Sequence, residues 1–272
     1  MKKKLLYMCS FVPYKTLEAA GFQMISAYDI ELGLKHSINN TKLSGNLCSF
    51  IKYCERIDYS EYDGVIFTNC CNSAQRLYDY VKFSYLNIFT YILDIPGNNQ
   101  LLKVDNQPEK VMTIDLINKL NCYFNVTISY NNIFKPEAQL VTQNHIWVIS
   151  SAIHKKYMWE LSSIFSNYNL KFDVCSSECR GDRLLSDEDS EISCLRMKNF
   201  YNWFEKKLNF VKGIIYIIAQ RCDHAMFSYP EIKKICDKHR YKILLVEEEF
   251  TSKISERSKI RYEAFKECLT EL

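Results

Sequence analysis

The chain has 272 residues, 35 of them basic and 32 acidic, with 47% hydrophobic and 25% charged residues. These values are ordinary for globular proteins, and the near-balance of charge gives no reason to expect a basic surface for nucleic-acid binding. No apolar run reaches membrane-spanning length, and the short run before Cys9 is far too short for a signal-peptide core, so we expect a cytoplasmic chain that binds neither nucleic acid nor membrane.

Short apolar segments rich in β-branched and aromatic residues alternate along the chain with longer amphipathic segments. Strands are expected at 4–8, 64–68, 89–94, 145–150, 171–174, 213–219 and 242–246. Helices are expected at 13–20, 47–57, 73–82, 110–124, 155–165, 190–208, 229–238 and 255–270. This alternation predicts an α/β fold with mainly parallel sheets. The polar segment 130–143 predicts a junction between an N-terminal lobe, 1–143, and a C-terminal lobe, 144–272.

One short pattern occurs in both halves. Cys71 follows the strand expected at 64–68 and Cys222 follows the strand expected at 213–219. Each cysteine is followed by a helix and then by a strand that ends on a carboxylate, which in the second half is Glu247. Ligands of parallel sheets gather at the carboxyl ends of the strands. The repeat therefore predicts two flavodoxin- or Rossmann-like lobes whose cysteines face one cleft.

Twelve cysteines are many for a chain of this kind. A reducing compartment argues against a disulfide framework, and the absence of any CxxC pair argues against a zinc site; the nearest spacing is Cys175 with Cys179. Core packing and iron–sulfur ligation remain open. Three cysteines on a four-iron cubane would leave one iron with an exchangeable position. Cys48 is the best third candidate, because a helix N-terminus favours the thiolate.

The glycines form neither a GxGxxG nor a P-loop pattern. The chain therefore lacks the usual dinucleotide and nucleotide signatures. If its reaction uses ATP, another protein is expected to hydrolyse it.

Several segments, in the right order and across nearly the whole chain, resemble the 2-hydroxyacyl-CoA dehydratase and benzoyl-CoA reductase family of iron–sulfur proteins. They are CSFVP at 9–13, CNSAQRLYD at 71–79, CRGDR at 179–183 and KIRYEAF at 259–265. The resemblance implies a [4Fe-4S] cluster held by Cys48, Cys71 and Cys222 in the cleft. Cys70 would point to the opposite side of an extended backbone, so we expect it to pack away from the cluster. The family also contains double-cubane [8Fe-9S] proteins. The extra ligands of those proteins fall near Cys179 and Cys194. In the alternative interpretation, Cys179 stabilises a turn and Cys194 is a buried helix residue.

The resemblance also implies an oxygen-sensitive enzyme of anaerobic metabolism. It would be a lyase that works with a homologous subunit, as a homo- or heterodimer, and with an ATP-hydrolysing activator that delivers one electron. That electron would convert the thioester of a bound acyl-CoA into a ketyl radical, which expels the hydroxyl group. His224 and Glu247 are candidates for polar groups beside the cluster. The alternative for each is an ordinary solvent-exposed side chain. Arg183 and Arg261 are candidates for binding the CoA phosphates. The alternative is that they form ion pairs at the surface or between the lobes.

Two departures from the family pattern bear on the activity. Lys15 stands where the family usually has a glutamate, and the segment 130–143 is shorter than the family's linker. We therefore expect a shortened member with the cluster-binding part retained. The alternatives are a double-cubane or electron-transfer protein that reduces a small molecule, and a non-catalytic partner subunit.

Overall fold

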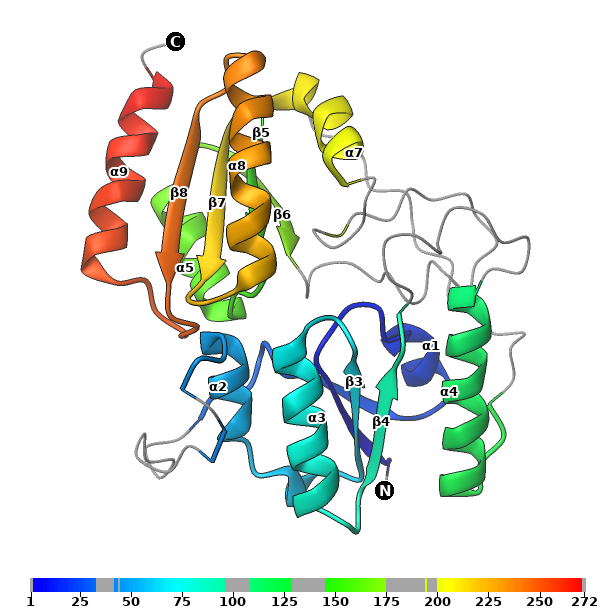
Figure 1. Cartoon of the computed structure of the whole chain (residues 1–272). Coiled ribbons are helices and arrows are strands. Elements are labelled where there is room, and N and C mark those ends of the chain that lie inside the picture. The colour runs from blue at the N-terminus through cyan, green and yellow to red at the C-terminus, as the bar shows by residue number, and fades with distance from the viewer. Residues whose placement is uncertain are drawn as a thin grey trace.

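The structure is a computed structural model that describes residues 2–32, 42–43, 45–95, 108–128, 145–174, 194 and 200–270. It has two lobes, each built on a four-stranded parallel sheet with helices on both faces (Figure 1). The expected junction at residue 143 lies outside the described residues. The predicted α/β fold with two parallel sheets is confirmed.

The first sheet has the strand order β2-β1-β3-β4. Its strands run parallel, with Tyr7 paired to Ile66 and Ile66 to Tyr91. The elements are β1 (Lys4–Tyr7), α1 (Tyr14–Ala19), β2 (Gln23–Ser26), α2 (Ser49–Glu55), a 3₁₀ turn (Tyr59–Glu61), β3 (Gly64–Thr68), α3 (Asn72–Ser84), β4 (Phe89–Leu93) and α4 (Pro108–Phe124).

The second sheet has the equivalent order β6-β5-β7-β8. The elements are β5 (His145–Ser150), α5 (Lys155–Ile164), β6 (Asn169–Val174), α7 (Phe200–Lys207), a 3₁₀ turn (Leu208–Phe210), β7 (Val211–Ala219), α8 (Asp223–Lys238), β8 (Ile243–Glu248) and α9 (Glu256–Thr270). Because the two sheets share one topology, β3 with Cys71 and β7 with Cys222 are equivalent units, as the repeat predicted.

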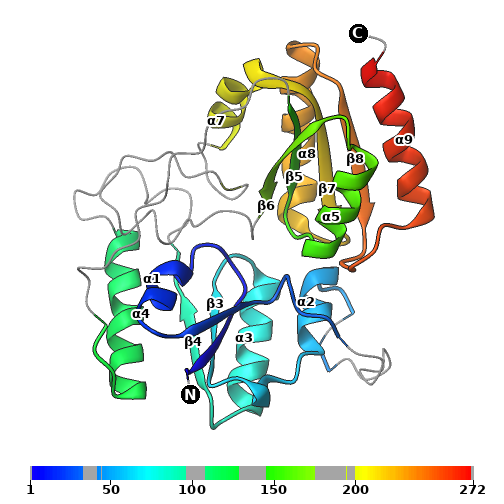
Figure 2. The ribbon, with the colours of Figure 1, turned by 180° about the vertical axis from the view of Figure 1, so that it is seen from behind.

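The central strands are apolar on both faces because helices cover both faces. In the first lobe, Leu6 and Val65 pack toward α2 and α3, whereas Leu5 and Ile66 pack toward α1 and α4. In the second lobe, alternate residues of β5 and β7 face either α5 and α9 or α7 and α8 (Figures 1 and 2). Among the described residues, no helix is both long and apolar enough to cross a membrane.

Three elements differ from the sequence expectation. The helix expected at 190–208 is observed as α7 at Phe200–Lys207, and Cys194, the one described residue before it in that range, is not helical. Strand β2 was not predicted, because Gln23–Ser26 is short and mixed in polarity and pairs only with β1 at the sheet edge. Helix α8 begins at Asp223 rather than at 229, and Pro230 lies inside it. Proline favours the first turn of a helix, so the sequence placed the helix start too late.

Candidate functional site

A cavity of about 90 Å³ lies where the carboxyl ends of the two sheets face each other. Figure 1 shows the strand arrows of both lobes pointing toward this junction. Its lining comes from both lobes and is almost entirely apolar or sulfur-bearing. The described residues that line it are Met8, Cys9, Phe11, Tyr28, Cys48, Phe50, Ile51, Phe67, Thr68, Cys70, Cys71, Ala74, Ser151, Ala152, Cys194, Ala219, Cys222 and His224. No lysine, arginine, aspartate or glutamate is among them.

Three of the cysteines each stand directly before a helix. Cys48 precedes α2, Cys71 precedes α3 and Cys222 precedes α8. The Cys71 sulfur accepts a hydrogen bond from the backbone N–H of Ala74 at 3.4 Å. The exposed N–H groups of a helix start stabilise negative charge, and this effect favours thiolates over thiols. The arrangement brings together the three cysteines that the sequence singled out.

The pKa values of these thiols differ in direction. The pKa of Cys71 is lowered, first by a hydrogen bond from Cys70 and further by the Ala74 N–H, against the effect of burial. Burial raises the pKa of Cys48 to about 12 and also raises the pKa of Cys222. The negative charge of neighbouring cysteines raises both pKa values further. Cys71 therefore has the most thiolate character of the three. A bound metal would remove the protons of the other two, because a coordinating thiol is deprotonated.

Cys70, Cys9 and Cys194 also line the cavity. The prediction that Cys70 packs away from the site is wrong. It assumed an extended backbone with alternating side chains, whereas residues 69–71 form the turn between β3 and α3. Cys9, which directly follows the strand expected at 4–8, lies in the lining as well.

The other predicted residues fall in different places. His224 lines the cavity although it is exposed, so it lies at the rim. Glu247 is exposed on β8 and Arg261 is exposed on α9, and neither lines the cavity. Cys179 and Arg183 lie outside the described residues. Within the described part of the chain, no three His, Cys, Asp or Glu side chains are grouped so as to hold a single metal ion.

Sequence reasoning missed Ser151, which lines the cavity directly after β5. The strand-end rule that selected Cys71 and Cys222 applies equally to this serine. A serine at this position, unlike a cysteine, does not by itself indicate a soft-metal ligand.

Ser49, which follows Cys48, connects the two lobes. Its backbone N–H donates to the carbonyl of Gln220 at 2.9 Å, and its Oγ accepts from the backbone N–H of Phe250 at 3.0 Å. Gln220 lies just before Cys222. The two cysteines from different lobes are thus held in register through Ser49.

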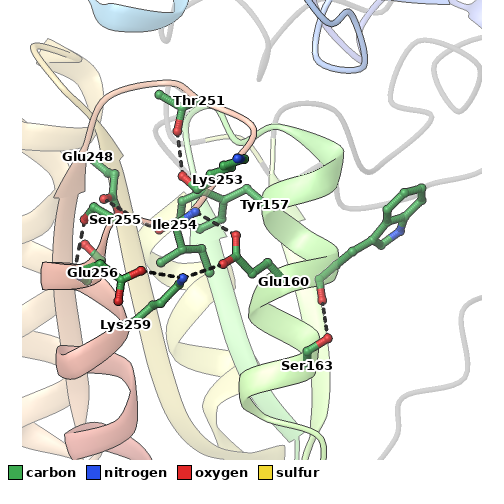
Figure 3. A network of polar contacts seen from close by, with 12 residues as sticks. Tyr157, Glu160, Ser163, Glu248, Thr251, Lys253, Ile254, Ser255, Glu256 and Lys259 are labelled. Atoms are coloured by element: carbon green, nitrogen blue, oxygen red, sulfur yellow. Dashed lines mark hydrogen bonds and ion pairs between the residues drawn. The ribbon is translucent and has the colours of Figure 1, made fainter.

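The loop between β8 and α9 carries Phe250 and is fixed at its far end by carboxylates. Glu160 accepts from the N–H of Ile254 at 2.9 Å, and Glu248 accepts from the N–H of Ser255 at 3.2 Å and from the Tyr157 hydroxyl at 2.7 Å (Figure 3). These bonds belong to the C-terminal lobe. They present Phe250 to the N-terminal lobe as an anchored side chain.

Phe250 packs among aromatic rings beside the cavity. Its ring lies edge-on to Phe50 at 4.9 Å and to Tyr53 at 5.0 Å between centroids, and His154 lies 5.9 Å away. His154 itself pairs its Nε2 with the carbonyl of Ile30 at 3.2 Å across the lobe junction. The cavity therefore has a packed apolar wall on the side of α2.

A family model described as 2-hydroxyglutaryl-CoA dehydratase, D-component, matches residues 9–169, more than half of the chain. No curated protein matches the chain. Among solved structures, the SBP FpvC from Pseudomonas aeruginosa with Mn²⁺ aligns over 100% of this chain and 99% of its own at 8% identity and a TM-score of 0.30. The Ni²⁺ form of FpvC aligns over 100% and 98% at 9% identity and a TM-score of 0.28, and scores this low carry no argument. The chain belongs to the 2-hydroxyglutaryl-CoA dehydratase D-component family.

Proposed function

We propose that this chain is the iron–sulfur subunit of a 2-hydroxyacyl-CoA dehydratase-like system, with a [4Fe-4S] cluster held by Cys48, Cys71 and Cys222. One observation carries the proposal: these cysteines precede three separate helices in two lobes and line one cavity. Core-packing cysteines have no reason to gather at the carboxyl ends of two sheets.

The chemistry of the lining fits this cluster better than other metals. Hard cations such as Mg²⁺ and Ca²⁺ need carboxylate or carbonyl oxygens, and no carboxylate is among the described lining residues. A zinc ion needs about four ligands that converge on one point. A cubane instead takes one thiolate at each iron corner, so its cysteines stand apart around a larger group. Thiols from three helix starts around an apolar cavity meet that requirement.

When bound, the cluster would supply one-electron chemistry and an iron position without a protein ligand. The chain's own residues would supply the surroundings. The apolar wall formed by Phe50, Tyr28 and Phe67 would exclude water, and His224 at the rim would donate a hydrogen bond to an entering carbonyl oxygen. A separate ATP-hydrolysing activator and a homologous subunit complete the proposed system.

A double-cubane protein is the second candidate, and the number of lining cysteines favours it. Two cubanes contain eight irons, and a sulfide that bridges them occupies one position on each, so about six positions remain for thiolates. Six cysteines line the cavity, namely Cys9, Cys48, Cys70, Cys71, Cys194 and Cys222. Cys9, Cys70 and Cys194 are the added ligands in this version.

Iron and sulfide content after strictly anaerobic purification tests both candidates. We expect about four irons per chain for the single cubane and about eight for the double one. Cys71→Ala should lose iron in either case, whereas Cys9→Ala and Cys194→Ala should lose it only in the double-cubane case. Cys54→Ala is the matched control, because Cys54 is fully buried and does not line the cavity. A chain without iron under these conditions would refute both.

The substrate class has a separate test on the iron-loaded protein. A 2-hydroxyacyl-CoA that enters the cavity should change the EPR spectrum of the reduced cluster, and free CoA at the same concentration should leave the spectrum unchanged. An iron-loaded chain that responds to neither would favour an electron-transfer role over a dehydratase role.

A further inference from the structure

Ser151 brings a hydroxyl group into the cysteine-lined cavity. It directly follows β5 and lies in the lining together with Cys222. No carboxylate or amide side chain is among the described residues that line this space.

The hydroxyl oxygen of Ser151 is fully buried and has no hydrogen-bond partner of normal geometry among the described residues. Its neighbour Ser150 is satisfied, because the Ser150 hydroxyl exchanges hydrogen bonds with the backbone of Ala152 at 3.1 and 3.3 Å. An unpartnered buried hydroxyl is unfavourable, so such a group normally has a partner in the working protein. Sulfur is the commonest side-chain acceptor among the described residues that line this cavity.

We propose that the Ser151 hydroxyl donates a hydrogen bond to sulfur, either the Cys222 thiolate or a sulfide of the bound cluster, and so raises the reduction potential of that cluster. The inference rests on the proposed iron–sulfur function and adds a positioning residue to it. A donated hydrogen bond withdraws electron density from sulfur and stabilises the reduced, more negative state.

The test compares the wild-type chain with Ser151→Ala, Ser151→Thr and Ser228→Ala after anaerobic cluster reconstitution. Ser228 is a matched control, because it is a buried serine of the same lobe that does not line the cavity. Iron content is measured first, and the midpoint potential is then obtained by a redox titration followed by EPR. Ser151→Gly removes the same hydroxyl a second time.

We expect equal iron content in all variants and a midpoint potential more negative by about 59 mV in Ser151→Ala and Ser151→Gly, a tenfold change for a one-electron couple. Ser151→Thr should restore the wild-type value, and Ser228→Ala should keep it. An unchanged potential in Ser151→Ala would overturn the inference while leaving the cluster in place. Loss of iron from both removal variants would show a structural role instead. Absence of iron from the wild-type chain would refute the proposed function itself.

Discussion

The backbone N–H of Ser49 donates to the carbonyl oxygen of Gln220 at 2.9 Å, so a residue next to Cys48 is bonded to a residue just before Cys222. The hydroxyl of Ser49 accepts a second bond from the same partner lobe, from the N–H of Phe250 at 3.0 Å. The separation of the two cysteines is therefore set by short contacts at one residue, Ser49.

Ser49→Ala removes the acceptor of the Phe250 N–H and leaves the bond to Gln220 intact. We expect a loss of about 1–2 kcal/mol in the free energy of unfolding, because the Phe250 N–H stays partly buried without a partner. Urea unfolding followed by circular dichroism measures it. Ser163→Ala is the control, since that exposed helix serine bonds only to its own helix at the carbonyl of Trp159 (Figure 3). Equal effects of the two substitutions would contradict the role of Ser49.

Phe250→Ala removes the ring that joins the loop of the C-terminal lobe to Phe50 and Tyr53. Phe250 is 5% exposed, and truncation of a buried phenylalanine costs about 3 kcal/mol or more. We expect a loss of that size in urea unfolding. Phe227→Ala should change stability by less than about 0.5 kcal/mol, because Phe227 is 81% exposed. A similar result for both would show that the aromatic contacts at the lobe junction contribute little.

The cysteines at the ends of β3 and β7 were predictable, because the position follows from topology. A parallel strand must end beside its neighbours, and a residue between that strand and the next helix lies at the ligand-binding edge whatever its side chain is. The remaining lining residues were harder to predict. Cys70 lies in a turn where the alternation of a strand does not apply. Phe250, which packs against the lining residue Phe50, comes from a loop whose path depends on Glu160, far away in the sequence.

The edge strand β2 and the start of helix α8 could not be predicted from the sequence for a related reason. Strand β2 has few apolar residues, because an edge strand buries less than a central one, and periodicity detects burial rather than hydrogen bonding. In α8 the local preference of Pro230 for a first turn was overridden, because the helix starts immediately after Cys222. Tertiary context decided both cases.

Stability should depend on pH through His154. Burial lowers the pKa of this imidazole; its Nδ1 accepts from the N–H of Lys156 at 3.1 Å, a bond that the protonated ring cannot make. The neutral form is therefore favoured in the fold. Its contribution is present above the unfolded-state pKa of about 6.5 and is lost as the pH falls through the lower folded-state pKa.

His154→Asn keeps a side-chain acceptor at the start of α5 and removes the titrating group. We expect the stability difference between pH 7 and pH 5 to be smaller in this variant than in the wild-type chain, measured as urea midpoints at both values. An identical pH dependence in the two proteins would show that His154 does not carry it.

The central claim is that Cys48, Cys71 and Cys222 hold a cubane with one iron free of protein thiolate. Mössbauer spectroscopy of the chain loaded anaerobically with ⁵⁷Fe tests it most directly. We expect about four irons per chain, one of them spectroscopically distinct from the rest, and loss of the whole spectrum in Cys71→Ala but not in Cys54→Ala. A wild-type chain that binds no ⁵⁷Fe, or that keeps its full spectrum without Cys71, would contradict it.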